Sequence, residues 1–234
     1  MNTRHPRLSI VIPVLDEAPR IRDCLEALVP LRRRAVEVVV ADGGSRDDTV
    51  SLARPLADQV IIAPRGRGAQ SHAGAQTARG ENLMFLHADT RLPDNADRRV
   101  LGALSAHPWG RFDVDIEGSH RMLGVIAAMM NLRSRLSGIA TGDQAMFVRR
   151  SAYEAAGGFP DIALMEDLAL SKALRRLGRP ACLHERVTTS GRRWEKHGVA
   201  RTILLMWRLR AAYCLGADPE RLARRYGYRP RGEH

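Results

Sequence analysis

Aromatic residues are scarce in this chain: Phe, Trp and Tyr together make up 5% of its 234 residues. Single-stranded nucleic acids bind through aromatic side chains on which the bases stack, and no zinc-finger or RNA-recognition signature is present. The chain nevertheless carries 37 Lys and Arg residues against 26 Asp and Glu, a formal net charge of +11. This composition argues against nucleic acid as the partner and favours an anionic membrane surface or phosphorylated substrates.

Cysteines and long apolar runs are also few. The three cysteines, Cys24, Cys182 and Cys214, show no metal-ligand spacing, which is typical of small buried side chains in a reducing cytosol. Residues 1–7 are polar and basic with no apolar stretch after them, so the sequence predicts no secretory signal. No run is long enough to span a bilayer. We therefore expect a cytoplasmic protein.

Two common nucleotide-binding signatures are missing. A dinucleotide-binding unit carries G-x-G-x-x-G after its first strand, but here that strand is followed by Asp16-Glu17-Ala18-Pro19. No G-x-x-x-x-G-K-[ST] run exists either. These absences argue against an NAD-dependent enzyme and against a P-loop nucleotide hydrolase.

The first 90 residues alternate between short apolar runs and helical patterns. The runs at 8–15, 36–41, 60–63 and 82–87 are typical of strands buried on both faces. This alternation predicts an α/β fold with a doubly wound, mainly parallel sheet flanked by helices. We expect further strands at 111–116 and 144–148, an edge strand at 181–187, and helices at 97–104, 122–136, 166–177, 199–215 and 219–226.

Neither a repeat nor a low-complexity linker divides the chain. We therefore predict a single domain over 1–234. Its parts are a nucleotide-binding half at about 8–90, an acceptor and catalytic half at about 91–195, and a C-terminal helical extension at about 196–234.

Polar clusters follow four of the predicted strands, at Asp16-Glu17, Asp42, 65–68 and 87–89. The carboxyl ends of parallel strands meet at one edge of the sheet, where ligands bind. Carboxylates there can bond a base and a ribose, while arginines and glycine N–H groups can contact phosphates. Each cluster taken alone also fits a helix start, a turn or a solvated surface. Their joint occurrence favours a nucleoside-diphosphate site.

Six motifs occur in an order that resembles an inverting glycosyltransferase of family 2 with the GT-A fold. The resemblance covers about residues 8–195 and is closest to a small bacterial, non-processive subgroup. The motifs are Ile10-Val-Ile-Pro-Val-Leu-Asp-Glu17, Ala41-Asp-Gly-Gly-Ser-Arg-Asp-Asp-Thr49, Arg65-Gly-Arg-Gly-Ala-Gln70, Phe85-Leu-His-Ala-Asp-Thr90, Gly157-Gly-Phe-Pro160 and Met165-Glu-Asp-Leu168.

The resemblance implies a role for each matching position. Asp167 matches the proposed catalytic base, with Glu166 beside it, and Asp89 matches the last Asp of the D-x-D metal motif, which would hold Mg²⁺ or Mn²⁺. The expected donor-binding residues are Pro13, Glu17, Asp42, Arg67, His87, Arg193 and Trp194. The implied reaction moves a sugar from a nucleotide-diphosphate donor, UDP-linked in many members, to an acceptor hydroxyl of a sugar or a lipid-linked molecule.

The chain departs from the family pattern at two positions. His87 stands where D-x-D has its first Asp; a neutral imidazole can bond a ribose or bind a metal, so metal use is less certain than in the family. Ser190 stands where processive members carry the Gln of Q-x-x-R-W, which argues against processive synthesis. Two alternatives stay open: a sugar-nucleotide-binding protein without turnover, and a nucleotidyltransferase.

The predicted helix at 199–215 has an apolar face and a face that carries arginines. Such a helix can lie on an anionic membrane. It can equally pack on the domain or pair with a second copy of the chain, and packing is the commoner outcome for an apolar stripe. The sequence thus leaves both peripheral membrane contact and a homodimer open.

Overall fold

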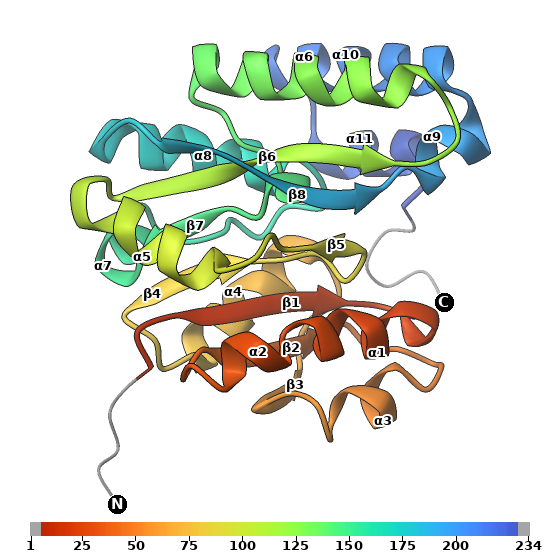
Figure 1. The fold of residues 1–234 in the computed structure, drawn as a ribbon. Helices are drawn as coiled ribbons and strands as arrows, with labels where there is room; N and C mark the ends of the chain where they lie inside the picture. Colours follow the sequence, from red (N-terminus) through yellow and green to blue (C-terminus); the bar gives the residue numbers. More distant parts are fainter. Residues whose placement is uncertain (1–5, 229–234) are drawn as a thin grey trace, which may run out of the picture.

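The first half of the chain forms a parallel sheet with helices on both faces (Figure 1). A computed structural model describes residues 6–228. The elements of this half are β1 (Ser9–Val14), α1 (Ala18–Ala27), α2 (Val29–Arg32), β2 (Glu37–Asp42), α3 (Thr49–Ala53), β3 (Gln59–Ile62), α4 (Arg67–Thr77) and β4 (Asn82–Phe85). β1 pairs with β2 and β4, and β3 pairs with β2, all in parallel. The predicted strand–helix alternation is confirmed.

The second half extends the same sheet. Its elements are β5 (Thr90–Arg91), α5 (Ala96–Ala106), β6 (Trp109–Glu117), α6 (Met122–Ser137), the 3₁₀ turn η1 (Gly142–Gln144), β7 (Phe147–Arg149), α7 (Arg150–Ala155), α8 (Glu166–Leu177), β8 (Ala181–Ser190), α9 (Arg192–His197), α10 (Val199–Cys214) and α11 (Pro219–Tyr226). Across the described residues the strand order is β3-β2-β1-β4-β7-β6-β8-β5. β7 runs antiparallel to both of its neighbours, whereas β6 and β8 are parallel.

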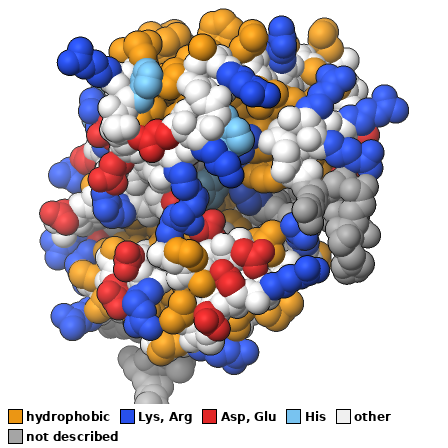
Figure 2. All heavy atoms as spheres, turned by 90° about the vertical axis from the view of Figure 1, so that its right-hand side faces the viewer, with side chains coloured by type: hydrophobic (Ala, Val, Ile, Leu, Met, Phe, Trp, Pro, Cys, Tyr) orange, Lys and Arg blue, Asp and Glu red, His pale blue; other side chains and the backbone are white. Residues whose placement is uncertain are grey.

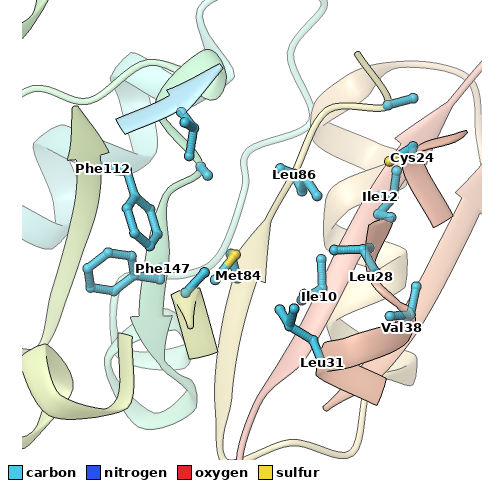
Figure 3. Close-up of a cluster of buried hydrophobic side chains, with 14 of the residues drawn as sticks. Ile10, Ile12, Cys24, Leu28, Leu31, Val38, Met84, Leu86, Phe112 and Phe147 are labelled. Atoms are coloured by element: carbon cyan, nitrogen blue, oxygen red, sulfur yellow. The ribbon is translucent and has the colours of Figure 1, made fainter. Parts of the chain in front are cut away.

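Apolar residues on alternate positions of the central strands cover both faces of the sheet. Ile10 and Ile12 face the helices α1 and α2, while Val11 between them faces the side of α4. Figure 3 shows the first of these layers, in which Ile10 and Leu28 approach each other. A Cβ atom added at Gly74 of α4 would stand 2.4 Å from Val11. The helix therefore lies directly on β1, and the core holds the strand ends in place.

Two strands differ from the sequence prediction in ways that matter for the site. β4 ends at Phe85, and the Thr90 N–H donates to the His87 carbonyl. His87 and Asp89 therefore lie on a turn, because the chain reverses there to pair β5 with β8. The two-residue β5 pairs only with Thr188 and Thr189 of β8. The predicted edge stretch 181–187 therefore pairs with β6 alone among the described strands.

The predicted strand at 144–148 is shorter than expected. It begins only at Phe147, because Gln144 belongs to η1 and bonds back to Thr141. The chain from 141 to 144 is thus a tight turn rather than a strand, and it brings Gly142 and Asp143 beside the turn that carries His87.

The C-terminal helices pack around the start of α8. Leu209 of α10 and Leu222 of α11 are buried against Met165 and Leu168, while α6 and α10 lie at the top of Figure 1. None of the helices within residues 6–228 combines the length and the hydropathy that crossing a bilayer requires.

A buried carboxylate ties together the amino ends of the central strands. Glu37 accepts hydrogen bonds from the Ser9 hydroxyl, the Gln59 amide, and the Arg79 backbone N–H and side chain, at 2.5–2.9 Å. Burial alone would raise its pKa, but these hydrogen bonds outweigh it and leave the pKa lowered. The charged form is therefore the one that the fold favours.

Glu37→Gln should remove a pH-dependent part of the stability. A carboxyl whose pKa is lower in the folded chain stabilises it above the unfolded pKa, and this contribution is lost as the pH falls through the folded pKa. We expect the variant to lose about 1–3 kcal/mol at pH 7 and to approach wild type between pH 5 and pH 3 in urea unfolding. Glu154→Gln, on the exposed surface of α7, is the control. A deficit that stays constant down to pH 3 would contradict the assignment.

Candidate active site

The carboxyl ends of the parallel strands open onto one side of the molecule, the right-hand side in Figure 1. Figure 2 looks at this side directly: acidic, basic and histidine side chains surround a hollow between the two halves. Polar side chains thus gather where an open α/β sheet binds its ligands.

Gln70 of α4 connects three of the loops at this edge. Its amide NH₂ donates to the carbonyls of Val14 (2.6 Å) and Ala41 (2.9 Å), and its amide oxygen accepts from the Gly66 N–H (3.2 Å). A Cβ atom at Gly43 would lie 2.9 Å from this amide, so only glycine leaves room for it. The buried Gln70 therefore holds the ends of β1 and β2 against the start of α4. Residue spacing did not reveal this role of Gln70, although a glutamine among the small residues of that helix is a signal.

Asp42 shapes the turn that follows β2. Its buried carboxylate accepts from the backbone N–H groups of Gly44 (2.8 Å) and Ser45 (2.9 Å) and from the Ser45 hydroxyl. That hydroxyl in turn accepts from the Asp16 N–H at 2.9 Å, which joins this turn to the one after β1. In this arrangement Asp42 positions the loop, and its carboxylate is occupied by the loop itself.

Glu17 and Asp89 are two carboxylates at the rim of the hollow. Glu17 pairs with Arg20 at 2.8 Å, and its side chain is 25% exposed. The side chain of Asp89 is also 25% exposed and lies 3.8 Å from Arg192. Burial, and next the charge of Glu17, raise the pKa of Asp89. A cation placed here would therefore relieve repulsion between acidic groups.

His87 is a neutral wall of the site. Burial, and next the charge of Arg67, lower its pKa to about 3. A Cβ atom at Gly142 would lie 2.6 Å from the His87 Nε2, so the ring packs against this glycine. The imidazole therefore remains uncharged at physiological pH, in contrast to the aspartate that D-x-D would place here.

An ion pair joins the donor side of the site to the start of α8. The Nε of Arg67 donates to the Oε1 of Glu166 at 2.7 Å, while the buried Oε2 has no hydrogen-bond partner. Burial raises the pKa of Glu166, and the charge of Arg67 opposes that effect. A Cβ atom at Gly68 would lie 2.8 Å from the Pro160 carbonyl, so the two segments are pressed together.

Asp167 follows directly and faces the same hollow. One of its carboxylate oxygens accepts from the Gly142 N–H at 2.9 Å, and the other accepts from the Leu168 N–H at 2.7 Å. The preceding Met165 has φ = 71°, a backbone conformation that costs energy for a residue other than glycine. This bend at the helix start orients the carboxylate.

A pocket brings five of the predicted site residues together. It is lined by Pro13, Arg67, Ser71, Phe85, His87, Gly142, Met146, Phe159, Glu166 and Asp167. Asp42, Glu17 and Asp89 lie outside this lining, in the turns around it. The pocket thus contains the expected base and the expected phosphate-binding arginine on opposite elements, α8 and α4.

Arg193 and Trp194 lie outside the lining of this pocket. The guanidinium of Arg193 stacks 3.5 Å from the ring centroid of Tyr226 and donates to its carbonyl at 2.8 Å. Trp194 packs against the main apolar core. Both residues fasten the C-terminal helices, and the ring of Tyr228 lies 5.8 Å from the Arg67 guanidinium.

Asp143 is a further acidic group that the predicted site did not include. The Thr141 hydroxyl donates to its carboxylate at 2.5 Å. Burial raises its pKa, which the Thr141 hydrogen bond partly offsets, and the nearby charge of Asp167 raises it further. The T-G-D-Q sequence of the turn was the available signal.

The residues present fit a divalent cation only together with a ligand. Within residues 6–228 no three His, Cys, Asp or Glu side chains lie close enough to hold a metal alone. Mg²⁺ commonly takes one or two carboxylates and completes its shell with substrate phosphates and water. Asp89, which is partly exposed and repelled by Glu17, meets that requirement.

The fold of this domain is the GT-A fold, shared with solved glycosyltransferases. TarS of S. aureus, solved with UDP-GlcNAc, has a TM-score of 0.64 at 19% identity, over 79% of this chain and 58% of that one. A mannosyltransferase from Pyrobaculum calidifontis, solved with GDP-Man and Mn²⁺, has a TM-score of 0.61 at 20% identity. The match covers 97% of this chain and 70% of that one. Similarity at this identity shows the fold.

The family follows from the sequence comparison. The model of glycosyl transferase family 2 matches residues 9–154, which is more than half of the chain. This protein belongs to glycosyl transferase family 2.

Individual relatives match over shorter stretches. A dolichyl-phosphate beta-glucosyltransferase of Drosophila melanogaster is 35% identical over 106 residues, which cover 37% of this chain and 32% of that protein. The glycosyltransferase AglE of Haloferax volcanii is 26% identical over 178 residues, which cover 69% of this chain and 58% of that protein. The chain thus spans about a third of the length of the first of these relatives.

Replacing Gln70 should lower the stability of the protein, because its amide joins the ends of β1 and β2 to the start of α4. Gln70→Met keeps the side-chain volume but removes three hydrogen bonds, each of which contributes about 0.5–1.5 kcal/mol net. We expect a loss of at least about 2 kcal/mol in urea unfolding. Gln76→Met, on the exposed face of the same helix, should change little. Equal stability of the two variants would show that the hydrogen bonds of Gln70 do not stabilise this edge of the sheet.

Proposed function

We propose that this protein transfers a sugar from a nucleoside-diphosphate donor, UDP-linked, to an acceptor hydroxyl with inversion and without processive synthesis. The observation that carries the proposal is the pocket in which Asp167 and the Arg67–Glu166 pair meet at the carboxyl edge of the sheet. The family supports a transferase, and solved neighbours hold UDP or UDP-GlcNAc.

The donor would lie along the ends of β1, β2 and α4. Glu17 offers a carboxylate for the nucleoside, with Pro13 and His87 as walls and Asp42 holding the loop. Arg67 at the first turn of α4 faces the diphosphate, where backbone N–H groups and the helix dipole also favour anions. Arg193 and Trp194 would act on the donor only by holding the C-terminal helices over Arg67.

Asp167 would act as the general base. Its carboxylate takes the proton of the acceptor hydroxyl while that oxygen attacks the anomeric carbon. The bond from that carbon to the diphosphate oxygen breaks on the opposite face, so one displacement inverts the configuration and releases UDP. Glu166 is paired with Arg67, so it positions the arginine and adds negative charge beside the base.

Asp89 would hold Mg²⁺ or Mn²⁺ against the donor phosphates. When bound, the ion supplies positive charge that stabilises the leaving diphosphate. Structural neighbours were solved with Mn²⁺ or Mg²⁺, which supports metal use. The neutral His87 leaves Asp89 as the charged member of this turn.

Two substitutions should separate binding from transfer. Asp167→Asn should retain the thermal shift caused by UDP with Mn²⁺ but lower the release of UDP from UDP-sugars by 10²–10⁴-fold, the usual contribution of a general base. Asp89→Asn should lose the Mn²⁺-dependent part of the shift. Asp94→Asn, exposed after β5, is the control.

The remaining outcomes decide against parts of the proposal. If wild type and Asp167→Asn release UDP equally, Asp167 is not the base. If UDP with Mn²⁺ produces no shift that depends on Asp89, the metal–nucleotide site is wrong. Binding of UDP-sugars without any turnover by the wild type would favour a binding protein.

We also propose that the helices α6 and α10 rest on the inner, anionic membrane surface. Apolar side chains are exposed on both helices and directly after α10: Met122, Val125, Met129, Leu132, Leu136, Leu204, Trp207 and Leu215. Exposed Arg121, Arg201 and Arg208 flank them, and Figure 2 shows apolar and basic groups along the upper edge. Apolar insertion combined with positive charge is the pattern of interfacial helices.

Vesicle binding tests this surface. The protein should sediment with phosphatidylglycerol vesicles and far less with phosphatidylcholine vesicles, and Met129→Glu with Trp207→Glu should reduce binding at least tenfold. Leu177→Glu, an exposed apolar site at the end of α8, is the control. A dimer in sedimentation velocity that the double variant dissociates, without vesicle binding, would show that a second copy covers the face.

A further inference from the structure

Two arginines beside the proposed base lack hydrogen-bond partners. The Nε and Nη2 atoms of Arg133 and the Nε atom of Arg210 are shielded from solvent, and none of them has a partner in the structure. Buried polar groups are nearly always hydrogen-bonded, because an unpaired one loses its hydration without compensation. These nitrogens therefore indicate a ligand that supplies acceptor atoms.

The two guanidinium groups also lie close enough to repel each other. Burial, and next the charge of Arg210, lower the pKa of Arg133 to about 10. Among the described residues neither arginine forms an ion pair within 4 Å. Two like charges without an ion pair within 4 Å favour binding of an anion with several acceptor oxygens.

The elements that carry the arginines place them next to the base. Arg210 follows Leu209, which is buried against Leu168, the residue after Asp167. The charges of Asp143 and Asp167 both act on Arg133. The anion would therefore sit beside the base, on the α6 and α10 side of the pocket, where the acceptor has to bind.

The neighbouring carboxylates do not satisfy these arginines. Asp143 accepts from the Thr141 hydroxyl, and Asp167 accepts from the backbone N–H groups of Gly142 and Leu168. No ion pair within 4 Å joins either carboxylate to Arg133 or Arg210, and the buried nitrogens of both arginines have no partner, so the arginines remain available.

We propose that Arg133 and Arg210 bind a phosphate ester group of the acceptor and so hold its neighbouring hydroxyl at Asp167. This inference rests on the proposed transferase function and names the acceptor class: a phosphate ester that carries a free hydroxyl. A soluble polyol phosphate and the headgroup of a glycerophospholipid share that chemistry. The bound phosphate positions the acceptor and takes no part in bond making.

The first test measures the binding of sn-glycerol 3-phosphate by thermal shift. UDP and Mn²⁺ are present in this measurement to occupy the donor site. Wild type should be stabilised by sn-glycerol 3-phosphate and not by glycerol. Arg133→Met and Arg210→Met should each weaken this binding at least tenfold while keeping the shift caused by UDP and Mn²⁺. Arg176→Gln, exposed on α8, should bind like wild type.

Stability without ligand gives an independent readout. Replacing an unpartnered buried charge by an apolar side chain removes its desolvation cost, so Arg133→Met should melt at or above the wild-type temperature without phosphate. A lower melting temperature together with unchanged binding of sn-glycerol 3-phosphate would show that the arginine is structural, and would overturn the proposal.

The source of the phosphate is decided by two acceptor preparations. UDP release in the presence of sn-glycerol 3-phosphate would indicate a soluble acceptor, whereas release only with phosphatidylglycerol vesicles would indicate a lipid; either result should be lost in Arg133→Met. If binding of sn-glycerol 3-phosphate depends on both arginines but UDP with Mn²⁺ does not bind, the phosphate site stands and the proposed donor site fails. Turnover unaffected by either substitution would overturn the acceptor role.

Discussion

The buried amide of Gln70 is the contact on which the donor side of the site depends. It satisfies carbonyls at the ends of β1 and β2 and an N–H at the start of α4, so three segments far apart in sequence meet at one side chain. The Val14 carbonyl also accepts from the Gly43 N–H at 2.9 Å, so the amide adds a second donor where backbone pairing between the strands ends. The missing side chain of Gly43 makes the contact sterically possible.

A second contact couples the two halves of the domain. The Arg67–Glu166 ion pair joins the first turn of α4 to the first turn of α8, and Gly68 allows the close approach behind it. The group expected to face the diphosphate is therefore fixed to the residue next to the proposed base. Since Glu166 is almost fully buried, loss of its partner would leave an uncompensated charge, so donor binding and base position are linked through one pair.

Most of the parallel sheet could be predicted from the sequence, while the limits of several elements could not. Apolar runs with helical patterns between them are local features, and they located β1, β2, β3 and β4 within a few residues. The strand β5 and the early end of β4 depend on pairing with distant β8, which leaves no local signature. The prediction that Pro13, Arg67, His87, Glu166 and Asp167 are site residues agrees with one shared pocket, because motifs at strand ends share an edge. Their chemical roles stay proposals.

By itself, the sequence determined the family, the alternation of strands and helices, and the types of side chain available at the sheet edge, because these follow from local pattern and motif order. Only the tertiary structure decided which of those side chains face the pocket. In the structure the carboxylate of Asp42 bonds to its own loop and Arg193 stacks on Tyr226. Buried nitrogens of Arg133 and Arg210 are left without partners. Burial and partner choice arise from contacts between distant segments, which residue spacing does not encode.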